Sequence, residues 1–162
     1  MIRERRREDL DRLCDILTAL DLPAITRSGK NPAEWLEEHD AAQSWVFDMA
    51  PVPVTPTRNV VGHVQILRCV PGPAADDVSE HTQLPSSELL AIDRLFVEPG
   101  PQAYGVARYL LKESVKYVRA RGRVPVVELH EHGFLTRGFF ERYGFTALRG
   151  DDSGAVLLVH PL

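Results

Sequence analysis

Apolar residues recur at three- and four-residue spacing in two long segments of the chain. The first stripe predicts an amphipathic helix over residues 8–20, and the second predicts a longer helix over residues 105–121 that Gly122 ends. Asn31 and Pro32 have the residue types of a helix cap and a first helical position, and they predict a short helix to about residue 42. A further short helix is expected over residues 134–143.

Shorter apolar runs predict strands, and the clearest is the run NVVGHVQILRC. The expected strands cover residues 1–5, 44–49, 59–69, 89–97, 124–129, 145–149 and 155–160. Prolines make residues 50–57 a connection, and polar turn-forming residues predict loops over residues 21–31 and 70–87 and a turn over residues 151–154. The second of these loops, 70–87, is expected to be the most mobile stretch of the chain.

The order of these elements predicts an α/β protein with a mixed sheet of six or seven strands and about four helices on its faces. Residues 1–162 contain no repeat and no shift in composition, so we expect a single domain. The chain is 44% hydrophobic and 26% charged, as in ordinary globular proteins.

The net charge of −4 gives no support to nucleic-acid binding. No apolar run is long enough to cross a membrane or to serve as the core of a signal peptide, so we expect a cytoplasmic protein with no membrane partner. Cys14 and Cys69 are too few for a disulfide scaffold, and their apolar neighbours predict small buried side chains.

Residues 94–111 contain the most informative motif. An apolar strand enters a Pro/Gly loop, the loop continues into Gln102-x-x-Gly105-x-Ala107, and an amphipathic helix follows at once. This order brings backbone N–H groups and the positive end of a helix dipole to one place, which suits a pyrophosphate.

Together with three other segments, this motif resembles the GNAT N-acetyltransferase superfamily. The matching pieces follow in the family's order: Val60-Val61-Gly62-His63-Val64, then Leu95-Phe96-Val97 with the glycine loop, then VPVVELHEHG, then Phe139-Phe140-Glu141-Arg142-Tyr143-Gly144-Phe145. The resemblance covers nearly the whole chain and implies a GNAT-like acyl-CoA N-acyltransferase fold that uses acetyl-CoA as acyl donor, with no metal.

The resemblance also implies which residues contact acetyl-CoA. In this family the loop amides hold the pyrophosphate, and the strand before the loop lies beside the thioester, where the Val97 N–H is the expected oxyanion donor. The expected cofactor-binding residues are Leu95, Phe96, Val97, Gln102, Ala103, Tyr104, Gly105, Val106, Ala107, Gly133 and Phe140.

Amine acetylation also requires a base, because an ammonium group is not nucleophilic. Asp93 is the first candidate, since period-two alternation places it on one strand face with Leu95 and Val97. Glu88 is the second candidate. An exposed carboxylate with no catalytic role remains the alternative for each.

The chain departs from the family at two helper positions. Phe140 occupies the place of a tyrosine that many members use as general acid, and Gly133 aligns with an asparagine that often contacts the cofactor. Tyr104 or Tyr143 remains open as a substitute acid. His130 and His132 share a strand face but indicate no complete metal site, and His63 is expected to be packed in the core.

The sequence therefore predicts an N-acetyltransferase that transfers acetyl from acetyl-CoA directly to a primary amine of a small molecule or peptide. The alternatives are a catalytically weak or inactive acyl-CoA sensor and an α/β domain with no coenzyme site. Residues 21–35 and 70–87 are expected to set acceptor selectivity. A homodimer through the C-terminal strands is possible, because sheet edges can pair.

Overall fold

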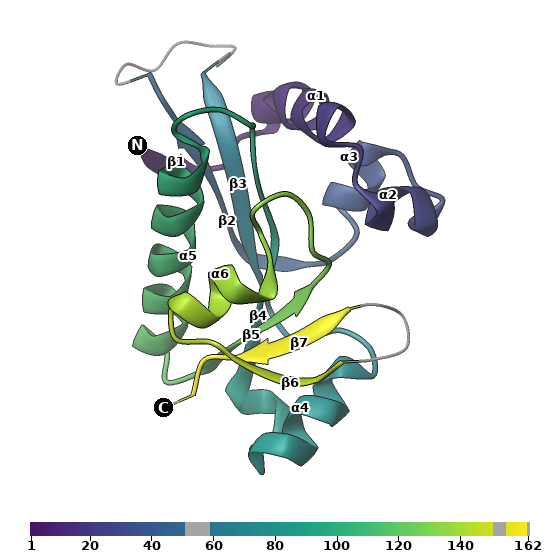
Figure 1. Ribbon diagram of the computed structural model, residues 1–162, viewed down its shortest axis with the longest axis vertical. Helices are drawn as coiled ribbons and strands as arrows, with labels where there is room; N and C mark the ends of the chain where they lie inside the picture. The colour runs from purple at the N-terminus through teal and green to yellow at the C-terminus, as the bar shows by residue number, and fades with distance from the viewer. Residues whose placement is uncertain (51–58, 151–154, 162) are drawn as a thin grey trace. The chain divides into compact units, whose positions relative to one another are not determined.

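The computed structural model describes residues 1–50, 59–150 and 155–161 (Figure 1). The expected connection over residues 50–57, apart from Ala50, and the expected turn over residues 151–154 lie outside these residues. Short 3-10 turns occur at Arg7–Asp9 and Ser86–Glu88. The helices and strands follow in the order β1 (Ile2–Glu4), α1 (Leu10–Leu20), α2 (Pro23–Ser28), α3 (Pro32–Leu36), β2 (Ala41–Asp48), β3 (Val60–Leu67), α4 (Ala74–Thr82), β4 (Leu89–Val97), α5 (Ala103–Ala120), β5 (Val124–Leu129), α6 (Arg137–Arg142), β6 (Thr146–Gly150) and β7 (Val156–Val159).

Within the described residues, seven strands form one sheet in the order β1-β2-β3-β4-β5-β7-β6. Strand β4 runs parallel to β5, whereas β1 pairs antiparallel with β2, and β7 pairs antiparallel with both β5 and β6. The predicted mixed α/β sheet is therefore confirmed, and the strand count matches the upper expected value.

The chain divides into two compact units. The first contains Met1–Gln65 and Arg94–Leu111, and the second contains Ile66–Asp93 and Lys112–Leu162. The N-terminal turns of α5 belong to the first unit, and the C-terminal turns belong to the second.

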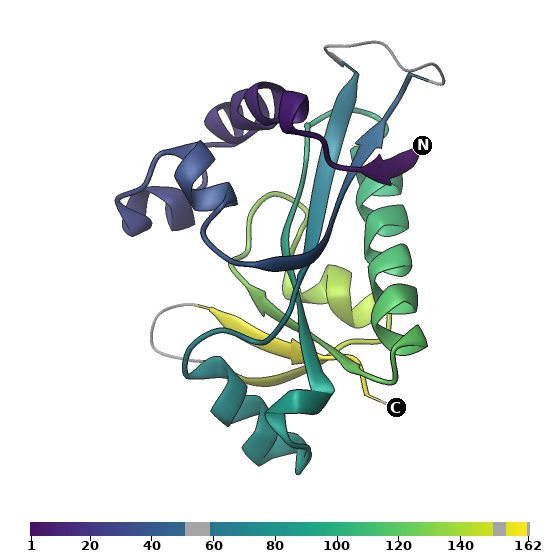
Figure 2. The same cartoon turned by 180° about the vertical axis from the view of Figure 1, so that it is seen from behind.

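In the first unit, α1 to α3 lie on one side of β2 and β3, and the first turns of α5 lie on the other (Figures 1 and 2). Strand β3 is buried along its whole length, as the continuous apolar run predicts. A buried core joins the helices to the strands, and it contains Leu13, Ile16, Leu17, Leu22, Ile25, Trp35, Leu36, Val46, Val60 and Phe96.

A buried ion network fixes the start of the chain. The Arg3 guanidinium lies 2.8 Å from Asp9 and 3.0 Å from Asp48, and both carboxylates are buried. The Asp9 hydrogen bond is the main reason why the pKa of Arg3 is raised. Because each buried carboxylate needs a cationic partner, this network joins β1 to the end of β2 and to the turn before α1.

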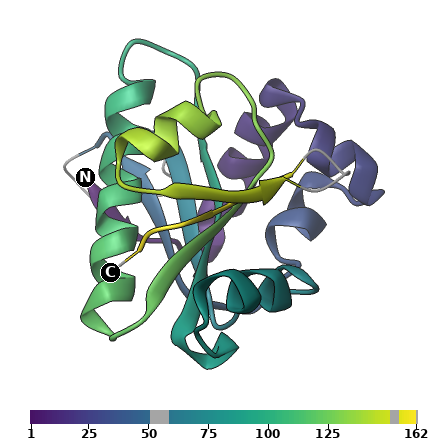
Figure 3. The ribbon, with the colours of Figure 1, turned by 60° about the horizontal axis from the view of Figure 1, so that its bottom comes forward.

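In the second unit, α4 and α6 lie on opposite sides of strands β5, β6 and β7 (Figures 1 and 3). Phe139, Phe140 and Phe145 pack edge to face, with ring centroids 5.3 and 5.7 Å apart. Gly144 has a φ of +93°, and a Cβ there would lie 2.9 Å from the His160 ring, so glycine is required at the end of α6.

Two predicted loops contain helices. Residues 21–31 include α2, which begins at Pro23 and ends at Ser28, where Gly29 follows as a cap in the left-handed region. Residues 70–87 include α4, whose first turn contains Asp76 and Asp77 and whose inner face buries Ala74 and Val78. Turn-forming residues at both sites mark helix ends, which is why the loop predictions were wrong.

Other boundaries shifted by smaller amounts. The capping box of Asn31 and Glu34 confirms the predicted start of α3, but this helix ends at Leu36 because β2 begins at Ala41. Helix α5 begins at Ala103, two residues before the predicted start. The structure describes six α-helices, more than the four or so that were expected.

Three further predictions concern side chains and membrane spans. Cys14 is half-buried and Cys69 is exposed, so the prediction of two buried thiols is wrong for Cys69. Among the described residues, no helix combines the length and the apolar character needed to cross a membrane. In the same residues, no group of three or more His, Cys, Asp or Glu side chains could hold a metal ion.

Candidate active site

Strand β4 contains a backbone irregularity at Arg94, whose φ is +53°. This left-handed conformation is costly for a side chain other than glycine, so it needs local support. The Arg94 guanidinium lies 3.8 Å from the centroid of the Trp35 ring, donates to the Trp35 carbonyl at 3.1 Å, and pairs with Glu38 at 2.8 Å. These contacts hold the irregular backbone in place.

His63 on β3 contacts the backbone of the same residue, Arg94. The ring is fully buried, and burial lowers the pKa of His63 to about 3, so the imidazole is neutral near pH 7. Its Nδ1 lies 2.9 Å from the Arg94 carbonyl oxygen, which can only accept, so Nδ1 carries the proton. His63 therefore fixes the carbonyl of the irregular residue. The prediction that His63 is packed in the core is confirmed.

Beyond Arg94, the strand presents the three residues expected beside the thioester. Phe96 is buried and stacks on His63 at 5.2 Å, Val97 is buried, and Leu95 is half-buried. The Glu98 N–H donates to the Val61 carbonyl at 2.7 Å, so the Glu98 amide points toward β3. Because successive strand amides point in opposite directions, the Val97 N–H points away from β3.

The glycine loop leads directly into the first turn of α5. The Ala103 amide donates to the Gly100 carbonyl at 3.1 Å, and the helical ladder starts with the Val106 amide donating to the Gln102 carbonyl at 3.0 Å. Tyr104 and Gly105 lie in the turn before the ladder, at the positive end of an 18-residue helix.

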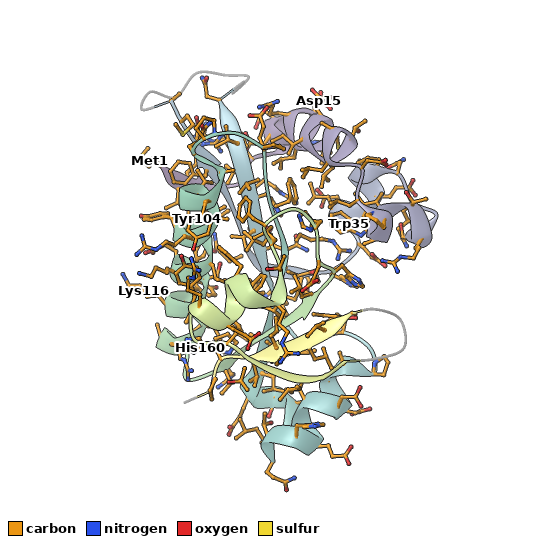
Figure 4. All side chains as sticks on the ribbon, in the orientation of Figure 1. Met1, Asp15, Trp35, Tyr104, Lys116 and His160 are labelled. Atoms are coloured by element: carbon orange, nitrogen blue, oxygen red, sulfur yellow. The ribbon has the colours of Figure 1, made fainter. Side chains whose placement is uncertain are left out.

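The side chains of this turn divide into two groups. Ala103, Val106 and Ala107 are buried, whereas Tyr104 and Gly105 face outward. Figure 4 labels Tyr104 on this turn. A Cβ added at Gly105 would meet no atom of the described residues within 4 Å, so the backbone there is open to a ligand.

The negative charge of a carboxylate next to the loop is already balanced by an arginine. Glu98 follows β4 immediately, and an isolated negative charge there would oppose a phosphate. Arg12 of α1 lies 2.7 Å from the Glu98 carboxylate and also donates to the Val60 carbonyl at 3.0 Å. The charge of Glu98 is therefore largely balanced.

The remaining predicted residues belong to the second unit. Asp93 is half-buried on β4, and Glu88 is exposed at the end of a 3-10 turn. The alternation used to place Asp93 on one face with Leu95 and Val97 is interrupted, because Arg94 has a positive φ. The role of each carboxylate stays a prediction.

Gly133 and Phe140 have contrasting surroundings. Gly133 is exposed, has a φ of +55°, and lies in a turn closed by paired His132 and Leu135. Phe140 is only 2% exposed, so its side chain is part of the aromatic cluster of α6. Tyr143 is half-buried against Phe139, with ring centroids 5.2 Å apart.

Residues 11–145 match the sequence model of the family described as "Acetyltransferase (GNAT) family". The chain belongs to this acetyltransferase family. No curated protein sequence shows significant similarity to it. The matched range includes the irregular strand, the glycine loop and the aromatic end of α6.

Solved GNAT structures share the fold at low sequence identity. NAA60 of Arabidopsis thaliana in complex with acetyl-CoA superposes with a TM-score of 0.70 at 21% identity, covering 98% of this chain and 96% of that one. The PaiA N-acetyltransferase of Thermoplasma acidophilum, in complex with coenzyme A, gives 0.64 at 14%, covering 100% and 98%. An aminoglycoside 6'-acetyltransferase type Ii gives 0.64 at 18%, covering 98% and 95%.

The loop of this GNAT chain fits a pyrophosphate on three counts. Its backbone is open at Gly105, the helix dipole favours an anion, and the adjacent carboxylate of Glu98 is paired. The sequence predicted Gly105 through the glycine pattern. It gave no sign of the role of Arg94, because a strand arginine with positive φ has no residue-type signature.

Proposed function

We propose that this chain is an acetyl-CoA-dependent N-acetyltransferase that moves the acetyl group directly to a primary amine of a small molecule or peptide. The observation that carries the proposal is the first turn of α5, where the open backbone of Gly105 lies at the positive end of a long helix. Membership of the GNAT family and the acetyl-CoA bound by the NAA60 structure support it.

Binding of the coenzyme is assigned to the backbone. Amides of the turn from Gln102 to Gly105, apart from the Ala103 amide that donates to Gly100, would receive the pyrophosphate. The buried side chains of Ala103, Val106 and Ala107 would hold that turn against the unit. The Val97 N–H, which points away from β3, would stabilise the oxyanion of the tetrahedral intermediate.

The reaction forms a C–N bond and breaks the C–S bond and one N–H bond of the amine, whose proton passes to the base. The amine nitrogen attacks the thioester carbonyl carbon, the C–S bond breaks, and the sulfur takes the electron pair. A lysine amine has an ordinary pKa of about 10.4, so a base must remove a proton near neutral pH. Asp93 or Glu88 is proposed for this role, directly or through water.

The leaving thiolate needs no dedicated acid. A thiol has an ordinary pKa of about 8.5, so the thiolate is a tolerable leaving group near neutral pH. Phe140 offers no proton and is buried, which supports transfer without protonation from that position. Gly133 and Phe140 also favour the second candidate function, a slow or inactive acyl-CoA sensor.

We also propose a domain organisation, a cellular location and an oligomeric state for the chain. We treat residues 1–162 as one domain that acts in the cytoplasm without nucleic acid or membrane. A homodimer through the C-terminal strands is part of the same proposal.

Turnover with a panel of primary amines tests the proposal. Coenzyme A release and the mass of the acetylated product are followed together, so that thioester hydrolysis is counted separately. We expect transfer to at least one amine, with kcat reduced about 10²-fold or more in Asp93→Asn or Glu88→Gln, whichever removes the base. Binding of acetyl-CoA without transfer to any amine would favour the sensor.

A further inference from the structure

Strand β4 is tied to residues of β3 on both sides of the amide that is proposed as the oxyanion donor. Before that amide, the His63 Nδ1–H donates to the Arg94 carbonyl at 2.9 Å. After it, the Glu98 N–H donates to the Val61 carbonyl at 2.7 Å. Peptide groups are planar, so a short segment with both ends held has few free dihedral angles. These two hydrogen bonds therefore limit the direction in which the Val97 N–H can point.

His63 also contacts the residue that carries the other half of the Val97 peptide group. Its ring stacks on the Phe96 ring, with centroids 5.2 Å apart and an interplanar angle of 22°. Both residues are 0% exposed, so neither ring can shift unless the surrounding core repacks. The Phe96 carbonyl and the Val97 N–H belong to one planar peptide group. His63 therefore restrains this group through a backbone contact at Arg94 and a side-chain contact at Phe96.

One tautomer of His63 suits both of the polar groups beside the ring. The Arg94 carbonyl can only accept, so Nδ1 carries the proton and Nε2 is an acceptor. The Arg5 guanidinium can only donate, and it lies 3.4 Å from Nε2 while Glu37 holds it at 2.9 Å. Both neighbours thus favour the neutral ring that donates to the Arg94 carbonyl.

Burial leaves His63 no direct part in the chemistry. A side chain with no exposed surface cannot touch acetyl-CoA or an amine. Burial also lowers the pKa of His63 to about 3, so the ring does not exchange protons near pH 7. Any effect of this residue on a reaction must pass through the groups that it holds.

We propose that His63 is a positioning residue for acetyl transfer, which directs the Val97 N–H toward the thioester oxygen. It does so by holding the Arg94 carbonyl and the Phe96 ring. A donor stabilises an oxyanion only when it points at the place where the charge develops, so a weaker restraint weakens that hydrogen bond. The inference rests on the proposed function, in which the Val97 N–H is the oxyanion donor.

Two substitutions of His63 separate its hydrogen bond from its packing. His63→Asn keeps an N–H donor near the place of Nδ1, whereas His63→Leu is apolar and has no donor. Ile16→Val is the matched control, because it removes one methylene from the same buried core and changes no hydrogen bond. Urea unfolding first establishes that each variant is folded. If His63→Leu does not fold, Phe96→Leu removes the ring stack and takes its place in the test.

The Val97 amide signal in ¹H–¹⁵N NMR spectra tests the direction of this N–H and needs no acceptor amine. Acetyl-CoA and coenzyme A both carry the pyrophosphate, so both should shift the Gly105 amide signal. Only acetyl-CoA carries the thioester carbonyl, so it should shift the Val97 signal further than coenzyme A does. We expect this acetyl-specific shift to persist in Ile16→Val and His63→Asn and to be lost in His63→Leu.

The outcomes distinguish the inference from the proposed function. An acetyl-specific Val97 shift of equal size in His63→Leu overturns the inference alone. A Gly105 shift without an acetyl-specific Val97 shift in the wild type rejects Val97 as the oxyanion donor, and the role of His63 with it. No Gly105 shift in the wild type rejects the proposed coenzyme site and therefore both proposals.

Kinetics add a second readout once an acceptor amine is found. His63→Leu should lower kcat about tenfold or more, because a misdirected donor no longer stabilises the transition state. KM for acetyl-CoA should stay within about twofold, since coenzyme binding is assigned to the glycine loop. His63→Asn should recover most of the lost kcat. Equal losses of kcat in His63→Asn and His63→Leu would show that the hydrogen bond has no positioning role.

Discussion

At the scale of single residues, Gly62 and Gly105 predict opposite effects of one substitution. A Cβ at Gly62 would lie 2.9 Å from Val106 Cγ1 and 3.2 Å from Val97 Cγ1, and neither valine can move away cheaply. Gly62→Ala should therefore lower the free energy of unfolding by about 1–3 kcal/mol. Gly105→Ala should raise it by about 0.5–1 kcal/mol, because an open helical position prefers alanine.

Urea unfolding of both variants measures these changes, and the two alanine variants serve as controls for each other. Equal stability of Gly62→Ala and the wild type would show that α5 does not pack on β3 as closely as described.

His63 predicts a pH dependence of stability. Burial lowers its pKa from 6.5 to about 3, so below pH 6.5 the unfolded chain binds a proton that the folded chain does not. Stability is therefore full above pH 6.5 and falls on acidification toward pH 3, by up to about 1.4 kcal/mol per pH unit from this residue. His63→Gln should reduce the slope between pH 5 and 6.5 in unfolding measurements, since other groups titrate equally in both proteins. An unchanged slope would contradict the buried neutral imidazole.

At the scale of elements, β4 depends on the backbone of Arg94. Both Arg94→Gly and Arg94→Ala remove the contacts with Trp35 and Glu38, but only glycine adopts a φ of +53° without strain. We expect Arg94→Gly to be more stable than Arg94→Ala by about 1 kcal/mol in chemical denaturation. In a regular strand alanine is more stabilising than glycine. A more stable Arg94→Ala variant would therefore indicate that β4 has no irregularity at this position.

The elements also show what local sequence can encode. Strands β4 and β5 were predicted to the residue, because long apolar runs between turn residues leave few alternatives. Helices α2 and α4 were missed, because prolines and polar residues serve equally as loop residues and as helix ends. Segments of six and nine residues are too short to show the helical periodicity that would have separated a helix from a loop.

At the scale of the whole molecule, the motif order predicted the fold and the glycine loop, because each motif sets the backbone conformation of a few consecutive residues. The positive φ of Arg94 and the neutral buried His63 arise from contacts between distant segments. No local pattern encodes such contacts. The sequence therefore indicated the proposed coenzyme loop but gave no indication of these contacts.

The proposed coenzyme site is tested most directly by thermal denaturation with acetyl-CoA in the wild type, Gly105→Glu and Lys116→Gln. Lys116→Gln is the matched control, because it also changes the net charge by −1 at an exposed position of α5 (Figure 4). We expect a rise in Tm for the wild type and for Lys116→Gln, and a much smaller rise for a folded Gly105→Glu, whose carboxylate would occupy the phosphate position. The absence of a shift at millimolar acetyl-CoA in the wild type would contradict the proposed coenzyme site and leave only the family and its fold.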